Sequence, residues 1–164
     1  MRMSTGFPPI ARRDARILIL GSLPSERSIA AGEYYAHPQN AFWRIIREIV
    51  GAEGSYDSRC AALIEARIAL WDVLRESVRP GSMDADIQLD TSEVNDFGNF
   101  LSLHPGIEKI CFNGRKAEAM FRRFVPLEAL QYQPALESLP STSPAYASMP
   151  FEVKLERWRS AIIA

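Results

Sequence analysis

The sequence predicts an α/β fold, a three-layer α/β/α sandwich with a four-stranded parallel central sheet. Its 164 residues are the length of one domain, which we expect to cover residues 1–164, with an N-terminal extension over 1–14. Four short apolar runs alternate with segments of helical periodicity, which is the pattern of parallel strands joined by helices on both faces of a sheet. No internal repeat, low-complexity tract or long linker divides the chain.

The first half of the chain is predicted to contain two strands and two helices. Residues 16–20 contain a continuous apolar run, Ile17 to Leu20, that stops at a glycine, as expected for a buried parallel strand. A long loop with several glycines and prolines follows. It leads to Asn40, the predicted N-cap of a helix that ends at Gly51. An alanine-rich helix is expected at residues 57–66, and a strand at residues 68–74.

The second half is predicted to continue the alternation. Apolar side chains recur at helical spacing over residues 94–103, ahead of a His-Pro-Gly sequence that ends the helix. Residues 109–113 form the third apolar run and lead into a helix at 117–124. A short fourth strand is expected at residues 135–139 and a last helix at residues 151–163.

The charge of the chain is close to neutral, but its distribution is uneven. Nineteen basic and 20 acidic residues give a net charge of −1 and a pI of about 6.1, whereas proteins that coat nucleic acid usually carry a basic excess. Residues 84–108 contain six acids and no lysine or arginine, so the rest of the chain carries a net charge of +5. Sixteen of the 19 basic residues are arginine, which suits bidentate contacts with phosphate.

Composition and spacing exclude several classes of site. The two cysteines, Cys60 and Cys111, cannot form a disulfide framework or a four-thiolate metal site. His37 and His104, the two histidines, lack the spacing of metal ligands, so we predict no metal and no cofactor. No apolar run approaches the roughly 20 residues that span a bilayer, and the first ten residues do not resemble a signal peptide. We therefore expect a cytoplasmic protein without a membrane partner.

Ligands of parallel α/β sheets bind beyond the carboxyl ends of the strands. At this edge the sequence places residues 21–40, 72–80, 113–116 and 140–145. Asp72 interrupts an apolar strand there, where a carboxylate is costly unless it faces a ligand or makes a structural hydrogen bond. Both readings of Asp72 remain open from the residues alone.

The loops at this edge fit none of the common catalytic motifs. Residues 21–25 (GSLPS) are not a P-loop, a GxGxxG turn or a GxSxG nucleophile elbow, but such a turn can bring backbone N–H groups close to a phosphate. Residues 34–43 carry aromatic side chains that could stack on a planar base or simply pack in the core. Residues 141–145 (STSPA) supply three hydroxyl groups that could hold a phosphate or form a plain polar turn.

These motifs resemble those of the uracil-DNA glycosylase superfamily, and most of all its hypoxanthine-DNA glycosylase family. GSLPS lies upstream of the string HPQNAFW at residues 37–43, and STSPA lies downstream. Further landmarks are WDVL at 71–74 with RPGS at 79–82, and FNGRKA at 112–117. The resemblance extends over residues 14–160. It implies a three-layer sandwich with four parallel strands.

The resemblance also implies roles for individual residues. Asn40 matches the asparagine taken as catalytic in the hypoxanthine-specific family, and Tyr35 matches the aromatic residue that stacks on the extruded base. Leu23 and Ser141 stand where many members carry a polar catalyst, and Tyr146 stands where relatives often have asparagine. The implied base-binding residues are Ser22, Leu23, Tyr35, Asp72 and Asn113. The implied DNA-binding residues are Ser25, Arg115, Lys116, Ser141, Thr142, Ser143, Pro144 and Ala145.

The predicted function is that of a monofunctional DNA glycosylase of base excision repair. It would flip a deaminated base out of DNA, with hypoxanthine favoured, and hydrolyse the N-glycosidic bond. Neither loop motif contains a lysine for Schiff-base chemistry, so no lyase step is expected. A uracil (mismatch) glycosylase and a non-catalytic module that binds lesion-containing DNA remain as alternatives. We further expect a monomer whose acidic segment, residues 84–108, lies away from the DNA.

Overall fold

The computed structural model describes residues 3–78, 87 and 92–163. The landmark at residues 79–82 and the acids Asp84, Asp86 and Asp90 lie outside this part of the chain. The central sheet contains four parallel strands in the order β3 (Ile68–Asp72), β2 (Ile17–Gly21), β6 (Lys109–Asn113) and β7 (Ala135–Leu139). The four predicted strands therefore pair as one parallel sheet.

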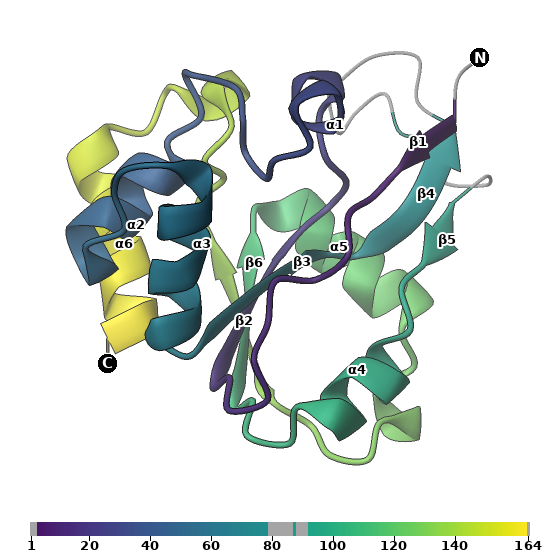
Figure 1. Cartoon of the computed structure of the whole chain (residues 1–164). Coiled ribbons are helices and arrows are strands. Elements are labelled where there is room, and N and C mark those ends of the chain that lie inside the picture. Colours follow the sequence, from purple (N-terminus) through teal and green to yellow (C-terminus); the bar gives the residue numbers. More distant parts are fainter. Residues whose placement is uncertain (1–2, 79–86, 88–91, 164) are drawn as a thin grey trace.

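Helices cover both faces of this sheet (Figure 1). One face packs against α2 (Phe42–Val50), α3 (Tyr56–Glu65) and α6 (Phe151–Ile163), through a cluster that includes Ile45, Leu63 and Trp158. The other face packs against α4 (Phe97–Leu103) and α5 (Arg115–Phe124). The predicted three-layer sandwich is thus confirmed.

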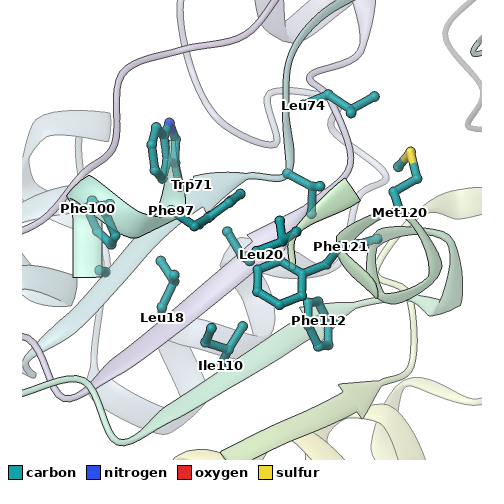
Figure 2. Close-up of a cluster of buried hydrophobic side chains, with 14 of the residues drawn as sticks. Leu18, Leu20, Trp71, Leu74, Phe97, Phe100, Ile110, Phe112, Met120 and Phe121 are labelled. Carbon is teal, nitrogen blue, oxygen red and sulfur yellow. The ribbon is translucent and has the colours of Figure 1, made fainter. Parts of the chain in front are cut away.

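Alternation along the strands produces the two cores. In β2, Leu18 and Leu20 face the helices α4 and α5, whereas Ile19 belongs to the opposite cluster, because successive strand side chains point to opposite faces. Figure 2 shows the cluster that packs against α4 and α5. In this cluster the ring centroids of Trp71 and Phe100 lie 4.9 Å apart. Within the central sheet, the buried polar residues Asp72 and Asn113 lie at the carboxyl ends of β3 and β6.

A second, antiparallel sheet was not predicted. It contains β1 (Met3–Thr5), β4 (Leu74–Val78) and β5 (Glu93–Val94) in the order β1-β4-β5. The strand expected at 68–74 therefore ends at Asp72, and the chain continues as β4 after Val73. Leu74 and Ser77 are buried and the two charged residues between them, Arg75 and Glu76, are more exposed, so β4 differs from the apolar runs of the central sheet.

The N-terminal residues lie along the outer edge of β3. Ile10 forms an antiparallel bridge with Leu70, and the Trp71 indole Nε1–H donates to the carbonyl of Phe7. The edge strand β3 is thereby covered, which protects it from pairing with another chain. Residues 3–10 of the predicted extension are therefore packed against the domain.

Other local predictions also differ from the structure. The helix expected at residues 94–103 begins at Phe97, because Val94 belongs to β5. The long loop expected after β2 contains a short helix, α1 (Glu26–Ala31), whose six residues are too few to show a periodic pattern. The N-cap of α2 is Ala41 rather than Asn40, although the Asn40 side chain still accepts the N–H of Phe42. No helix in the described ranges is long and apolar enough to cross a membrane.

Candidate functional site

The carboxyl ends of the central strands meet at one edge, where register places Gly21 beside Asp72 and Asn113 beside Leu139. Asp72 is 3% exposed and Asn113 is 8% exposed. The loops that follow β2 and β7 both lie at this edge, and they contain most of the residues to which the sequence assigned a role. The edge predicted from topology therefore gathers the candidate site.

Asp72 and Tyr35 converge on Gly21. A Cβ atom at Gly21 would lie 2.6 Å from Asp72 Oδ1 and 2.8 Å from the Tyr35 hydroxyl, closer than such atoms can approach. Only glycine leaves room for both polar groups above the end of β2. The carboxylate and the phenol are thus held side by side at the centre of the strand edge.

Tyr35 has an unusual backbone conformation. Its φ of 55° lies in the left-handed region, which bulky residues rarely adopt. Its ring stacks on Phe42 with centroids 4.2 Å apart and an interplanar angle of 26°. Neighbouring hydrogen bonds hold this strained turn, from Trp43 Nε1 to the carbonyl of Tyr34 and from Ala36 N–H to Ser28 Oγ. Strain of this kind is typical of functional sites, where the surrounding structure maintains it.

Asn40 lies in a tight turn ahead of α2. Its Oδ1 atom accepts the backbone N–H of Phe42 at 2.9 Å, and its own N–H donates to the carbonyl of His37. Because a backbone N–H needs an acceptor, this bond assigns Oδ1 and leaves the NH₂ group to donate; Asn40 lines a pocket of about 180 Å³ together with Tyr35 and His37. Asn40 is therefore placed to donate hydrogen bonds rather than to accept a proton.

The loop after β7 is joined to this turn. Asn113 Nδ2 donates to Thr142 Oγ1 at 2.9 Å, and Thr142 N–H donates to Asn113 Oδ1 at 2.9 Å. Ala41 N–H then donates to the carbonyl of Thr142. Asn113 and Thr142 thereby position the 140–145 loop beside Asn40. The role of Asn113 in base binding stays a prediction, since both ends of its amide contact Thr142.

The other predicted contact residues differ in their access to solvent. Ser22, Leu23 and Thr142 are buried. Ser25 caps α1 through a bond from Ser28 N–H. Arg115 is exposed at the start of α5, and the remaining residues, Lys116, Ser141, Ser143, Pro144 and Ala145, are half-buried or exposed. Their contacts with DNA stay predictions.

Sequence reasoning missed several residues around the site. Asn95, which precedes α4, donates from Nδ2 to the carbonyl of Asp72 and so braces the end of β3. Arg44 and Arg59 line the pocket next to Asn40, and the Arg59 guanidinium lies 4.8 Å from the centroid of the Trp43 ring. The spacing of α2 and α3 marks these arginines as surface positions but does not reveal which loop they face.

Charge at the site is mixed. Burial and the nearby carboxylate of Asp72 raise the pKa of Tyr34.

In the described part of the acidic segment, Glu108 precedes β6 at the opposite, amino edge of the sheet, where it pairs with Arg16 at 3.1 Å. Within the described ranges, no three His, Cys, Asp or Glu side chains come together as metal ligands.

Comparison with known families accounts for this arrangement. The family model described as the uracil DNA glycosylase superfamily matches residues 8–163. The chain belongs to this superfamily. The match extends over the central sheet, both candidate loops and α6, so the resemblance found in the motifs holds for the whole domain. Membership confirms the predicted class of enzyme, a DNA glycosylase, and DNA as its substrate.

Individual members of the superfamily are also similar. A protein of Methanosarcina acetivorans named hypoxanthine DNA glycosylase is 42% identical over 115 residues, which cover 68% of this chain and 72% of that protein. A protein of Methanosarcina barkeri with the same name is 39% identical over 115 residues, which again cover 68% of this chain and 72% of that protein. The solution NMR structure of a candidate uracil DNA glycosylase from M. acetivorans superposes with a TM-score of 0.80 at 34% identity, and covers 98% of this chain and 97% of that one.

Proposed function

We propose that this glycosylase removes hypoxanthine from DNA, with Asn40 as the catalytic residue. The convergence of Asp72 and Tyr35 over Gly21 is the observation that supports this function most strongly. It offers an acceptor for the edge of a base next to an aromatic ring, which is the chemistry that a flipped nucleobase requires. The names of the two archaeal relatives favour hypoxanthine among the deaminated bases.

Selection of hypoxanthine would depend on Asp72. Hypoxanthine carries a ring N–H at the position where adenine has an unprotonated nitrogen. The carboxylate of Asp72 can accept a hydrogen bond from the ring N–H of hypoxanthine. The lone pair of the adenine ring nitrogen would repel it, and the buried carboxylate would then lack a partner on the base. A carboxylate has room for several hydrogen bonds, so Asp72 can accept from the base while keeping its contacts within the protein.

Bond cleavage would depend on hydrogen-bond donation. The bond between C1′ of the sugar and the purine nitrogen breaks, its electron pair moves to the base, and water adds to the oxocarbenium-like sugar. Negative charge therefore develops on the departing base, which then takes up a proton. The NH₂ group of Asn40 donates to this base while Phe42 holds the amide oxygen. A fixed donor of this type typically accelerates a reaction about 10²- to 10³-fold.

The decisive experiment compares excision from duplexes that contain inosine or deoxyuridine, scored as alkali-labile abasic sites. Asn40→Asp is the informative variant, because aspartate can still accept the N–H of Phe42 but cannot donate as an ionised carboxylate. We expect this variant to fold normally and to lose about 10²-fold or more in single-turnover excision. Full activity of Asn40→Asp would contradict the mechanism, and absence of inosine cleavage by the wild type would contradict the function.

The second candidate function is excision of uracil. Uracil also carries a ring N–H that a carboxylate can accept, and the similar NMR structure is described as that of a candidate uracil DNA glycosylase. Faster cleavage of the deoxyuridine duplex than of the inosine duplex would favour this function. Tight binding of both duplexes without release of either base would instead favour a non-catalytic module.

A further inference from the structure

A second pocket adjoins the Asn40 turn. Its volume is about 360 Å³, and its lining includes Gln39 and Ala41, the two neighbours of Asn40. Ser143 from the loop after β7 and Phe151 from the start of α6 complete its wall. The pocket therefore adjoins the site at which the reacting nucleotide is expected to lie.

Lys154 of α6 is the unusual residue of this pocket. It is 5% exposed, although lysine is almost never this buried without a partner. Among the described residues, its ammonium group makes no ion pair and no hydrogen bond. Burial lowers the pKa of Lys154, as expected for a cation that has lost water without gaining an opposite charge. An anionic ligand would supply the missing partner.

The surroundings of Lys154 favour an anion. Arg44 lines the same pocket and its guanidinium lies 4.0 Å from the centroid of the Phe151 ring. The hydroxyl of Ser143 accepts the N–H of Ala145, so its own O–H is available to donate. None of the described lining residues is acidic. The pocket also lies at the amino end of α6, where the helix dipole favours negative charge.

We infer that Lys154, Arg44 and Ser143 form a subsite for one backbone phosphodiester of the lesion-carrying strand, next to the flipped nucleotide. This inference rests on the proposed function, because it takes DNA as the ligand and Asn40 as the neighbouring catalytic group. It explains why a lysine from the last helix is buried beside the 141–145 loop. Lys154 and Arg44 would add phosphate contacts from outside both loop motifs, next to Ser143 of the second motif.

The test is a walk of single neutral methylphosphonates along the lesion strand of a duplex that carries a stable abasic analogue. Binding of the full chain is measured at each position for the wild type, Lys154→Met and Arg47→Met. Arg47 is the matched control, because it is an exposed arginine of α2 that does not line the pocket, and its loss changes the net charge equally.

For the wild type, one methylphosphonate near the lesion is expected to weaken binding about tenfold, the usual effect of losing a hydrogen bond to a charged group. Lys154→Met should weaken binding by a similar factor and become insensitive to that methylphosphonate. Its slope of log K against log salt should fall by about 1. Arg47→Met should keep the wild-type profile. A wild-type profile in Lys154→Met overturns the inference.

Two further arms keep the test decisive. Arg44→Met probes the subsite at an exposed residue, where folding is not at risk. Its binding should become insensitive to the methylphosphonate that weakens wild-type binding. If Arg44→Met stays sensitive to every methylphosphonate that affects the wild type, the subsite is overturned. Excision of inosine by the wild type is scored separately. If the wild type excises inosine but no phosphate position depends on Lys154 for binding, only the subsite is overturned. If one phosphate position depends on Lys154 but inosine is not excised, only the proposed function is overturned.

Discussion

Asn113 and Thr142 hold each other through two hydrogen bonds of 2.9 Å, one in each direction, between the end of β6 and the loop after β7. Thr142 is 1% exposed, so neither bond is replaced by water. This pair, together with the bond from Ala41 N–H to the carbonyl of Thr142, connects the central sheet to the turn that carries Asn40.

Removing the hydroxyl of Thr142 should loosen the connection. Thr142→Val leaves Asn113 Nδ2 buried without its acceptor, which costs about 1–3 kcal/mol of folding free energy. We expect a matching loss in urea unfolding and slower excision. Thr142→Ser keeps the hydroxyl and serves as the control, with activity close to that of the wild type. Equal stability of the valine variant and the wild type would show that the bond contributes nothing.

Gly21→Ala should disable the site without unfolding the protein. The new Cβ would press on Asp72 Oδ1 and the Tyr35 hydroxyl, so both groups must move. We expect at least a tenfold loss of excision, measured under single-turnover conditions. Gly51→Ala is the matched control, because Gly51 ends α2 at a φ of 74° with open space around it. That variant should lose about 1 kcal/mol of stability and keep its activity.

Stacking by Tyr35 can be separated from its backbone conformation. Tyr35→Asn keeps a residue that tolerates the left-handed region but removes the ring, whereas Tyr35→Phe keeps the ring. The asparagine variant should weaken binding of lesion DNA by about 10- to 100-fold, the usual contribution of stacking on a base. The phenylalanine variant should bind much more tightly than the asparagine variant. If the two variants bind lesion DNA equally, Tyr35 does not stack on the base.

Asp72→Asn should change base selection more than stability. The amide can donate to an unprotonated ring nitrogen, which the carboxylate cannot do. We therefore expect slower excision of hypoxanthine, by about tenfold or more, and weaker discrimination against adenine in competition binding. Unfolding midpoints of variant and wild type provide the control. Unchanged rates on inosine and deoxyuridine substrates would remove Asp72 from the recognition of either base.

Cys111 should make stability depend on alkaline pH. Burial in β6 raises its pKa from 9.0 to about 12. A raised folded-state pKa gives a contribution to stability that is complete below the unfolded-state pKa and is lost as pH rises, because only the unfolded thiol ionises. The free energy of unfolding should therefore fall more steeply above pH 9 in the wild type than in Cys111→Ala. Parallel curves for the two proteins would refute this assignment.

Alkylation gives an independent measurement for the same residue. Cys111 should resist iodoacetamide at pH 8 in the folded protein and react once urea unfolds it, since the thiolate is the reactive form. Cys60, which is only half-buried, provides the internal comparison within the same chain.

Three strands of the central sheet, β2, β3 and β6, could be predicted because they are buried on both faces and contain short apolar runs, whereas the edge strand β7 is only partly buried and includes Glu137. The smaller sheet could not, because β1 and β5 are three and two residues long and β4 continues directly from the second apolar run. The region of the site followed from strand order, since the carboxyl ends of parallel strands share an edge. Motifs predicted roles for Asn40 and Tyr35, which lie close together in the chain.

Contacts between distant segments escaped prediction for a common reason. Lys154 and Arg44 lie on different helices, and helical periodicity assigns each of them to the polar side. In the folded protein Lys154 is buried and lines a pocket with residues of the 140–145 loop, whereas Arg44 stays exposed. In the same way, the sequence shows Asn113 as a polar residue at a strand end but does not reveal that Thr142 occupies its amide.

The hydrogen bond between Asn40 and Phe42 also provides a way to observe the site in solution. The Phe42 amide proton is bonded to the side chain proposed to act on the base, so its NMR chemical shift and its exchange with deuterium report on the orientation of that side chain. A product base that engages the NH₂ group of Asn40 polarises the amide and strengthens its oxygen as an acceptor. One backbone resonance can therefore follow occupancy of the site without any label on the nucleic acid.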